Sequence, residues 1–582
     1  MRLQTSTQLM TLGNSILVRA LFVAFTALAL PLTDCAATPP KILGPARTGG
    51  SVHDSRFRSE GSWLKLGEGK FVSVGMNTND GKVFVQHASG YDQPWQPDVP
   101  ANLLWATKVA QDRDGRLHAM WLVMRGKGTP AVDRFIDIWY ARTSGADGQW
   151  EAAHRIWEGY VGAICGRITQ LKSGRIILPF AHWLPEERRG PPRGCNASTV
   201  IYSDDAGKTW KESASRLFAP CPENYNGDPV GAVEPVVLEL NDGRVWMLMR
   251  TQAGVLYESF SRDGVDWSPA QPTKFPSSTG PPELVRLPDG RIVMFWNHCE
   301  LPPRFENQGV YGGRDALHAA ISRDEGKTWR GFREVYLDPT RHNSPPKRGD
   351  RGTAYPQFKH MQNGKMFFAS GQGETLRVLI ELDPDWLEET SRADDFSDGL
   401  TNWSTFKPFG PAKGWWRDRV RGSALVEHPA KPGQSVLRIA KPDEKDADGA
   451  MWNFPAGRGG KVTACIRINQ GFRGATISLL DHFFDPTDEA GEKHATCSVN
   501  IAADGKVNGK GAVKNGEFCE VAISWDLEKR TANVTVDGAD AGAIPLLGNP
   551  PHGLSYLRFR SAAKEKDTAG LLIESVKAEV RP

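Results

Sequence analysis

The sequence has little excess charge and little cysteine, and both shortages restrict its function. Its 71 Lys and Arg side chains nearly balance 68 Asp and Glu side chains, which leaves a formal net charge of +3. A protein without a strong overall field does not attract polyanions, so we expect no nucleic-acid partner and no binding to a membrane surface. The eight cysteines are scattered, without the paired C-x-x-C spacing of a zinc site. The cysteine spacing therefore predicts no zinc site, and we expect no metal site elsewhere in the chain.

Long hydrophobic runs are also missing beyond the N-terminus. Basic residues precede one apolar run over residues 20–30, which is too short to span a bilayer, and small residues follow at Cys35-Ala-Ala37. This pattern predicts an export signal over residues 1–37 and a mature protein that is periplasmic or secreted, with no membrane span. Lipoprotein anchoring at Cys35 is the less favoured alternative, because Asp34 is unusual in front of a lipid-modified cysteine.

Glycine and proline, in contrast, are abundant. The chain contains 60 Gly and 40 Pro without a strict short period, a composition that indicates many turns between short strands. A length of 582 residues is too great for one ordinary domain, so we expect at least two.

One short pattern occurs six times: a small or acidic residue, Gly, a basic residue and then an apolar strand. Gly supplies the positive φ that a tight hairpin turn needs, and the strand that follows begins the return arm. The copies are Glu68-Gly-Lys70, Asp114-Gly-Arg116, Ser173-Gly-Arg175, Asp242-Gly-Arg244, Asp289-Gly-Arg291 and Asn363-Gly-Lys365. Hairpins repeated at blade-like intervals predict an all-β, six-bladed β-propeller.

A second pattern, S-x-D-x-G-x-T-W, alternates with the first. Full copies run from Ser203 to Trp210 and from Ser322 to Trp329, and shortened or degraded copies end at Trp95, Trp150 and Trp267. These are Asp boxes, turns between the last two strands of a blade, in which Asp and Ser side chains bind the turn backbone. We expect their carboxylates to be structural rather than catalytic. The sixth blade is expected to close the ring without a box, which leaves no exposed sheet edge.

The repeats stop near Trp386, and short strands with Gly, Asp and Asn turns continue to the C-terminus. The sequence therefore predicts a propeller over residues 45–385 and a jelly-roll (concanavalin-like) β-sandwich over residues 394–582. Such a module either binds carbohydrate or supports the propeller. Trp415 and Trp416 are either a sugar-stacking platform or buried aromatic residues.

An ordered series of Arg, Glu, Arg, Arg and Tyr runs through the propeller. It consists of Arg58-Ser-Glu-Gly, Glu234-Pro-Val-Val, Leu248-Met-Arg250, Gly313-Arg314 and Ala354-Tyr355-Pro356. With the Asp boxes, this series resembles the sialidase (neuraminidase) superfamily, in particular its bacterial branch with degenerate boxes. The resemblance covers residues 50–380. It implies an exo-glycosidase that removes a terminal sialic acid or a related acidic sugar from glycans without a cofactor.

The resemblance also implies a role for each residue of the series. Arg58, Arg250 and Arg314 would clamp the sugar carboxylate, because the planar fork of Arg binds a carboxylate bidentately. Tyr355 would be the nucleophile and Glu234 its base, since a neutral phenol avoids the repulsion between a carboxylate nucleophile and the sugar's own carboxylate. Arg56 competes with Arg58, because the usual Arg-Ile-Pro context is absent.

The general acid is the least defined role. Asp80 is the nearest match to the family's loop Asp, Glu60 competes with it, and a plain turn residue is an alternative reading of Asp80. Arg167 is a further candidate for substrate binding, and His182 and Arg125 are weaker ones. Two rival functions stay open: a carbohydrate-binding propeller without catalysis, and a propeller hydrolase or lyase for another acidic polysaccharide.

Overall fold

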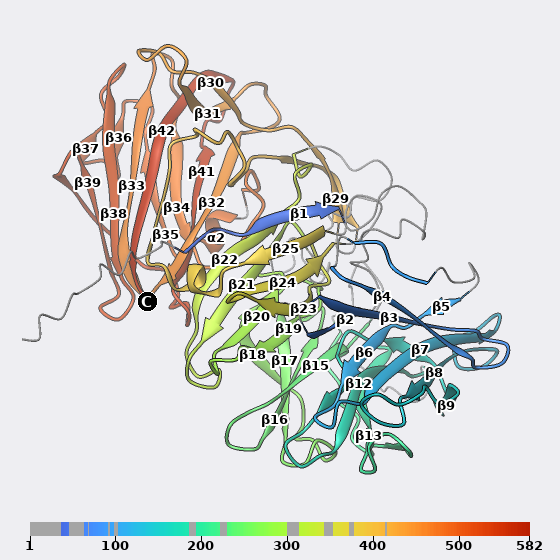
Figure 1. The fold of residues 1–582 in the computed structure, drawn as a ribbon. Coiled ribbons are helices and arrows are strands. Elements are labelled where there is room, and N and C mark those ends of the chain that lie inside the picture. The colour runs from blue at the N-terminus through green and yellow to red at the C-terminus, as the bar shows by residue number, and fades with distance from the viewer. Residues whose placement is uncertain are drawn as a thin grey trace, which may run out of the picture. The chain divides into compact units, whose positions relative to one another are not determined.

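A computed structural model shows a chain built almost entirely of antiparallel sheets (Figure 1). It describes residues 37–45, 63–67, 69–90, 93–97, 103–185, 194–221, 230–299, 313–342, 353–371, 378–413, 416–489 and 491–582. Most of the predicted export signal lies outside the described residues, as do Arg56, Arg58, Glu60 and Trp415. Only the backbone of Trp416 is described.

Six sheets follow one another along the first part of the chain and form the six blades of a β-propeller. The first blade contains β2 (Trp63–Gly67), β3 (Lys70–Met76), β4 (Val83–Ala88) and β5 (Leu104–Trp105). The second contains β6 (Lys108–Gln111), β7 (Leu117–Gly126), β8 (Arg134–Arg142) and β9 (His154–Trp157). The third contains β10 (Val161–Ala163), β11 (Thr169–Gln170), β12 (Ile176–Trp183), β13 (Asn196–Ser203) and β14 (Lys211–Glu212).

The fourth blade contains β15 (Val233–Glu239), β16 (Val245–Arg250), β17 (Val255–Ser261) and β18 (Gln271–Pro276). The fifth contains β19 (Glu283–Arg286), β20 (Ile292–Trp296), β21 (Ala316–Ser322) and β22 (Arg330–Leu337). The sixth contains β23 (Gln357–Gln362), β24 (Lys365–Ser370) and β25 (Val378–Leu382). First strands of neighbouring blades contact each other, such as β15 with β19 and β23 with β2, so they surround the centre of the ring.

The N-terminal strand completes the sixth blade. β1 (Lys41–Pro45) pairs with β25 in the register Lys41↔Glu381, and Figure 1 shows the two strands side by side. This strand begins at Lys41, ahead of residue 45, where the sequence pattern placed the start of the propeller. The ring is thus closed by the two ends of the propeller segment, which pair in one sheet.

The two sequence repeats are turns, as predicted. The central Gly of each of the six hairpin turns has a positive φ, between 64° and 97°. In the box that starts at Ser203, Asp205 accepts hydrogen bonds from the backbone N and the hydroxyl of Thr209 at 2.8 and 2.6 Å. Asp324 makes the same two bonds to Thr328 in the box at Ser322. The boxes therefore hold the last turn of their blades together.

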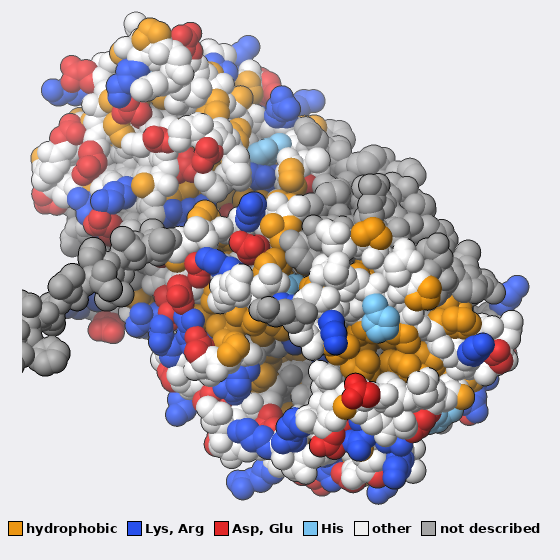
Figure 2. All heavy atoms as spheres, viewed as in Figure 1, with side chains coloured by type: hydrophobic (Ala, Val, Ile, Leu, Met, Phe, Trp, Pro, Cys, Tyr) orange, Lys and Arg blue, Asp and Glu red, His pale blue; other side chains and the backbone are white. Residues whose placement is uncertain are grey.

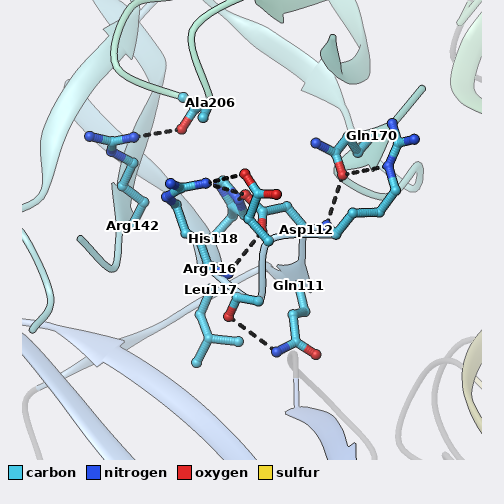
Figure 3. A network of polar contacts seen from close by, with 12 residues as sticks. Gln111, Asp112, Arg116, Leu117, His118, Arg142, Gln170 and Ala206 are labelled. Carbon is cyan, nitrogen blue, oxygen red and sulfur yellow. Dashed lines mark hydrogen bonds and ion pairs between the residues drawn. The ribbon is translucent and has the colours of Figure 1, made fainter. Parts of the chain in front are cut away.

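Neighbouring blades are joined by apolar clusters and by a few polar contacts. One such contact lies between the second and third blades (Figure 3), where Arg142 Nη1 donates to the carbonyl oxygen of Ala206 at 2.7 Å. Close by, Asp112 accepts from the backbone N of Arg116 at 2.8 Å and contacts Nε2 of His118 at 3.2 Å. Asp112 precedes the Gly115 hairpin turn of the second blade, and Arg116 and His118 follow it, so this polar network has a structural role.

The C-terminal part consists of two antiparallel sheets that share one hydrophobic cluster. The larger sheet contains β26 (Ser391–Asp394), β30 (Ala424–Glu427), β31 (Ser435–Lys441), β33 (Gly459–Ile468), β38 (Phe518–Asp526), β39 (Thr531–Val536), β40 (Ala539–Ile544) and β42 (Asp567–Arg581). The smaller contains β27 (Trp403–Ser404), β32 (Gly449–Gly457), β34 (Ala475–Leu480), β35 (Cys497–Ile501), β36 (Lys506–Val507), β37 (Gly511–Ala512) and β41 (Leu554–Ser561). We call this part the C-terminal module.

Three short elements complete the structure. A 3₁₀ helix, η1 (Pro384–Glu388), follows the last blade, and the hairpin of β28 (Lys407–Lys413) and β29 (Trp416–Val420) and the short helix α2 (Gly491–His494) belong to the module. No helix in the described part of the chain has the length and hydropathy of a membrane span. Acidic and basic side chains are interspersed over the face in Figure 2, in keeping with the small net charge.

Candidate active site

The hairpin of the fourth blade brings Glu234 and Arg250 together. β15 and β16 pair with Val233 opposite Arg250, so both residues lie at the end of the hairpin away from its Gly243 turn. Arg250 Nη1 donates to Glu234 Oε2 at 2.7 Å, and each side chain is only 7% exposed. Charges this deeply buried are tolerated only when they are paired. Each group therefore keeps the other in place, and the Glu234 carboxylate and the Arg250 guanidinium have a fixed relative position.

Two further blades add Tyr355 and Arg314 to this pair. Tyr355 precedes β23, and its hydroxyl accepts a hydrogen bond from Arg250 Nη1 at 3.1 Å. Arg314 precedes β21, and its guanidinium lies 5.4 Å from the centre of the Tyr355 ring. Thr279 joins the two arginines: its hydroxyl accepts from Arg250 Nε at 3.0 Å and its carbonyl from Arg314 Nη2 at 2.7 Å. Four predicted site residues from three blades thus converge.

The surroundings of Tyr355 keep its phenol protonated. Burial raises the pKa of Tyr355, and the carboxylate of Glu234 raises it further, while the guanidinium groups of Arg250 and Arg314 lower it less. The net pKa is above the ordinary value near 10. A phenol of this kind reacts as a nucleophile only when a base removes its proton during attack.

Arg250 lies between the candidate nucleophile and its candidate base. The same nitrogen, Nη1, donates both to Glu234 and to the hydroxyl of Tyr355. Among the described contacts, Glu234 and Tyr355 are connected through this nitrogen rather than by a direct hydrogen bond. Catalytic hydrogen bonds often form only when substrate is bound, so this arrangement is compatible with proton transfer between the two.

Arg167 extends across the ring to a residue that the sequence reasoning missed. From the third blade it reaches Glu283, at the start of β19, with Nε 2.8 Å from Oε1, and its guanidinium lies 5.0 Å from the ring centre of Phe358 on β23. Glu283 is 4% exposed, whereas Arg167 is 39% exposed. Glu283 begins the first strand of its blade almost as Glu234 does, and that position was the signal available in the sequence.

Cys165 is the second residue that was missed. Its carbonyl oxygen accepts a hydrogen bond from the Lys108 ammonium at 2.6 Å. Burial raises the pKa of the Cys165 thiol well above its ordinary value, and the nearby Glu234 carboxylate adds to the rise. Cys165 therefore remains a neutral thiol beside the Glu234–Arg250 pair. No sequence pattern marks it.

The described contacts of the other candidates are with residues outside this cluster. Asp80 is in the exposed turn between β3 and β4, where its carboxylate accepts from the backbone N of Lys82 at 3.0 Å. Arg125 pairs with Glu158 at 2.8 Å and with Asp137. His182 packs its ring at 5.1 Å against Trp157. Within the described residues, no group of three or more His, Cys, Asp or Glu side chains could hold a metal ion.

Residues 92–368 match a family model described as a BNR repeat-like domain. This match identifies residues 92–368 as a BNR repeat-like domain. It agrees with the boxes and hairpins that the fold displays, since the matched residues begin at the first Asp box and end in β24 of the propeller. No curated protein matches the chain.

Several solved structures are similar to the chain at low identity. A Trypanosoma rangeli sialidase is 11% identical with a TM-score of 0.37, and the similarity covers 94% of this chain and 97% of that chain. The same enzyme with 2,3-difluorosialic acid is 13% identical with a TM-score of 0.36, covering 90% and 91%. A Dyadobacter fermentans protein of unknown function is 16% identical with a TM-score of 0.38, covering 59% and 97%. Likenesses this distant carry no information about the activity of this chain.

Proposed function

We propose that this protein is a retaining exo-glycosidase that removes a terminal sialic acid, or a related acidic sugar, from glycans. The observation that supports the proposal is the convergence at Arg250, whose guanidinium contacts Glu234 and Tyr355 while Arg314 lies beside the same ring. A sugar with a carboxylate on its anomeric carbon needs fixed cations and a neutral nucleophile. A propeller that only binds sugar has no need of a buried phenol next to a carboxylate.

The proposed reaction has two steps. The sugar carboxylate binds the arginines and draws the Arg250 guanidinium towards itself, which leaves Glu234 to accept the phenol proton. The oxygen of Tyr355 then bonds to the anomeric carbon, while the bond to the leaving oxygen breaks and that oxygen takes a proton from the general acid. In the second step the deprotonated general acid takes a proton from water, and the water oxygen bonds to the anomeric carbon. The bond from that carbon to the Tyr355 oxygen breaks, and the phenol recovers its proton from Glu234.

Three further roles complete the proposal. Arg58 would be the third arginine of the clamp, and Asp80 or Glu60 the general acid. Arg167 would add a further cation from the third blade, and Glu283 holds it in place. No cofactor takes part in this scheme.

The domain organisation and the location of the protein belong to the same proposal. We take residues 1–37 as an export signal and 394–582 as a jelly-roll module, in a periplasmic or secreted enzyme. The propeller, expected over residues 45–385, is extended to residue 41 because β1 completes its sixth blade. N-terminal sequencing of the exported protein, with cleavage expected near Ala37, tests the first of these assignments.

A fluorogenic sialoside assay tests the activity. The wild type should release the fluorophore, and Tyr355→Phe should lower kcat at least ~100-fold, because the nucleophile is removed. Tyr336→Phe is the matched control: Tyr336 is a buried propeller tyrosine on β22, outside the cluster, so its loss should leave kcat unchanged.

Other outcomes would replace the proposal. Binding on a glycan array without hydrolysis of any sialoside would indicate a carbohydrate-binding propeller. Release of products from uronate-containing glycans, but not from sialosides, would indicate a hydrolase or lyase for another acidic polysaccharide.

A further inference from the structure

A buried ion pair links the C-terminal module to the residue that follows Arg314. Residues 37–582 form one compact unit, which includes both the propeller and the module. Within it, Arg419 of β29 pairs with Asp315, and each of these side chains is 2% exposed. The Arg419 guanidinium also lies 3.7 Å from the centre of the Phe406 ring. A pair of opposite charges without solvent has few alternative arrangements, so Asp315 is held firmly.

Hydrogen bonds connect the Arg314 segment to the segment of Tyr355. Thr353 Oγ1 donates to the carbonyl oxygen of Arg314, and Asn297 Nδ2 donates to Thr353 Oγ1 at 3.3 Å. Thr353 precedes Tyr355 by two residues, and the Tyr355 ring faces the Arg314 guanidinium at 5.4 Å. A displacement of the Arg314 backbone therefore reaches the candidate nucleophile.

The module holds the same region at a second point. Nε2 of His298 lies 2.7 Å from the carbonyl oxygen of Asp481, and the backbone N of Phe483 donates to the carbonyl oxygen of His298 at 3.0 Å. His298 follows Asn297, the residue that donates to Thr353. Apolar side chains from both parts, Cys299 and Phe483 among them, share one buried cluster around these contacts.

We propose that the C-terminal module is a structural part of the active site, with Arg419 as a positioning residue. The ion pair between Arg419 and Asp315 sets the position of Arg314 against Tyr355, and so determines how well an acidic sugar is held. This inference rests on the proposed function and deepens it. A shift of about 1 Å in a positioned group can lower kcat/KM by up to ~100-fold, so an anchor outside the propeller has a measurable effect on the binding of substrate.

The test compares Arg419→Gln, Arg419→Lys and the double variant Asp315→Asn/Arg419→Gln with the wild type. We expect Arg419→Gln to raise KM about tenfold or more and to leave kcat within about threefold, because a carboxylate clamp acts in the ground state and the transition state alike. Arg419→Lys should restore part of the affinity. The double variant leaves no unpaired buried charge, yet should keep the raised KM.

Amide hydrogen exchange on the full chain gives a readout that does not depend on turnover. Peptides that contain residues 313–316 and 353–356 should exchange faster in Arg419→Gln and in the double variant than in the wild type. Arg558→Gln is the matched control, because Arg558 is a buried module arginine that pairs with Glu492 at 3.0 Å inside the module. It should leave KM and both peptides unchanged.

Wild-type KM and wild-type exchange in a folded Arg419→Gln protein would overturn the inference. If that variant does not fold, the same values in the double variant would overturn it equally. If the wild type cleaves no sialoside, the proposed function fails by itself, and the exchange of the two peptides still decides whether Arg419 positions the Arg314 segment.

Discussion

The backbone at Glu234 and Tyr355 has a conformation that residues with side chains rarely adopt. Their φ angles are 53° and 61°, and a proline follows each residue. A non-glycine residue in this left-handed region costs on the order of 1 kcal/mol, and such strain is often retained where function needs it. Other described residues share the conformation. What distinguishes these two is that their strained positions direct side chains from different blades to the same guanidinium.

Motif order was sufficient to select the four residues that converge, but it could not show how they are paired. Glu234, Arg250, Arg314 and Tyr355 each stand in a recognisable local context. Glu283 does not, because its importance comes from Arg167, which reaches it from two blades away. The start of β19 is the only local signal for Glu283, and it does not encode the contact with Arg167, which depends on the closed ring.

Glu334 makes stability depend on pH. Burial raises the pKa of this carboxyl to about 7 from an ordinary value near 4.5, although a hydrogen bond from the Tyr556 hydroxyl at 2.8 Å opposes the rise. The folded state therefore holds the proton more tightly than the unfolded state. The stabilisation of the folded state by the protonated Glu334 carboxyl is fully present below pH 4.5 and is lost as the pH rises to about 7.

Glu334→Gln should remove this dependence. From pH 4.5 to about pH 7 the free energy of unfolding of the wild type should fall by roughly 3 kcal/mol relative to that of the variant. The Gln side chain of the variant carries no charge at any of these pH values. Denaturant unfolding of both proteins at a series of pH values measures the difference. Parallel curves for the two proteins would show that Glu334 is ionised in the folded state across this range.

The repeated turns are the elements that sequence reasoning predicts best. Each hairpin has Gly at a fixed offset, and each full Asp box has Ser, Asp and Trp at fixed offsets, so the number of blades follows from counting the hairpins. β1 has no such signature, and its partner β25 lies at the other end of the propeller segment. For this reason the outer strand of the sixth blade was not anticipated.

Asp205→Ala should destabilise the third blade without affecting catalysis. The carboxylate accepts hydrogen bonds from Ser203 Oγ and from the backbone N and hydroxyl of Thr209, at 2.8, 2.8 and 2.6 Å. Losing them should cost about 2 kcal/mol. The box joins β13 and β14 at the end of the blade away from the candidate site, so kcat should not change.

The neighbouring Asp204 provides the control for this prediction. Its side chain is 45% exposed and pairs with Arg175 at 2.6 Å. An exposed ion pair contributes less than about 1 kcal/mol, so Asp204→Ala should be the milder change. Equal losses in thermal and denaturant unfolding of the two variants would contradict the structural role of the box.

Closure of the ring determines whether the whole propeller is stable. β1 covers the edge of β25, and an uncovered edge strand invites aggregation. A chain that begins at residue 46 should therefore unfold at a temperature lower by roughly 5 °C or more and aggregate more readily than a chain that begins at residue 37. Scanning calorimetry of the two chains measures the effect, and identical midpoints would mean that β1 does not close the ring.

The central claim about the molecule is that its blades, held by the C-terminal module, bring a phenol and cations together for covalent glycosyl transfer. The most direct measurement is peptide mass spectrometry after incubation with a fluorinated sialic acid that forms a slowly hydrolysed glycosyl–enzyme. We predict one sugar adduct, on the peptide that contains Tyr355, and none in Tyr355→Phe. An adduct on another residue, or sialoside turnover without any adduct, would contradict the account.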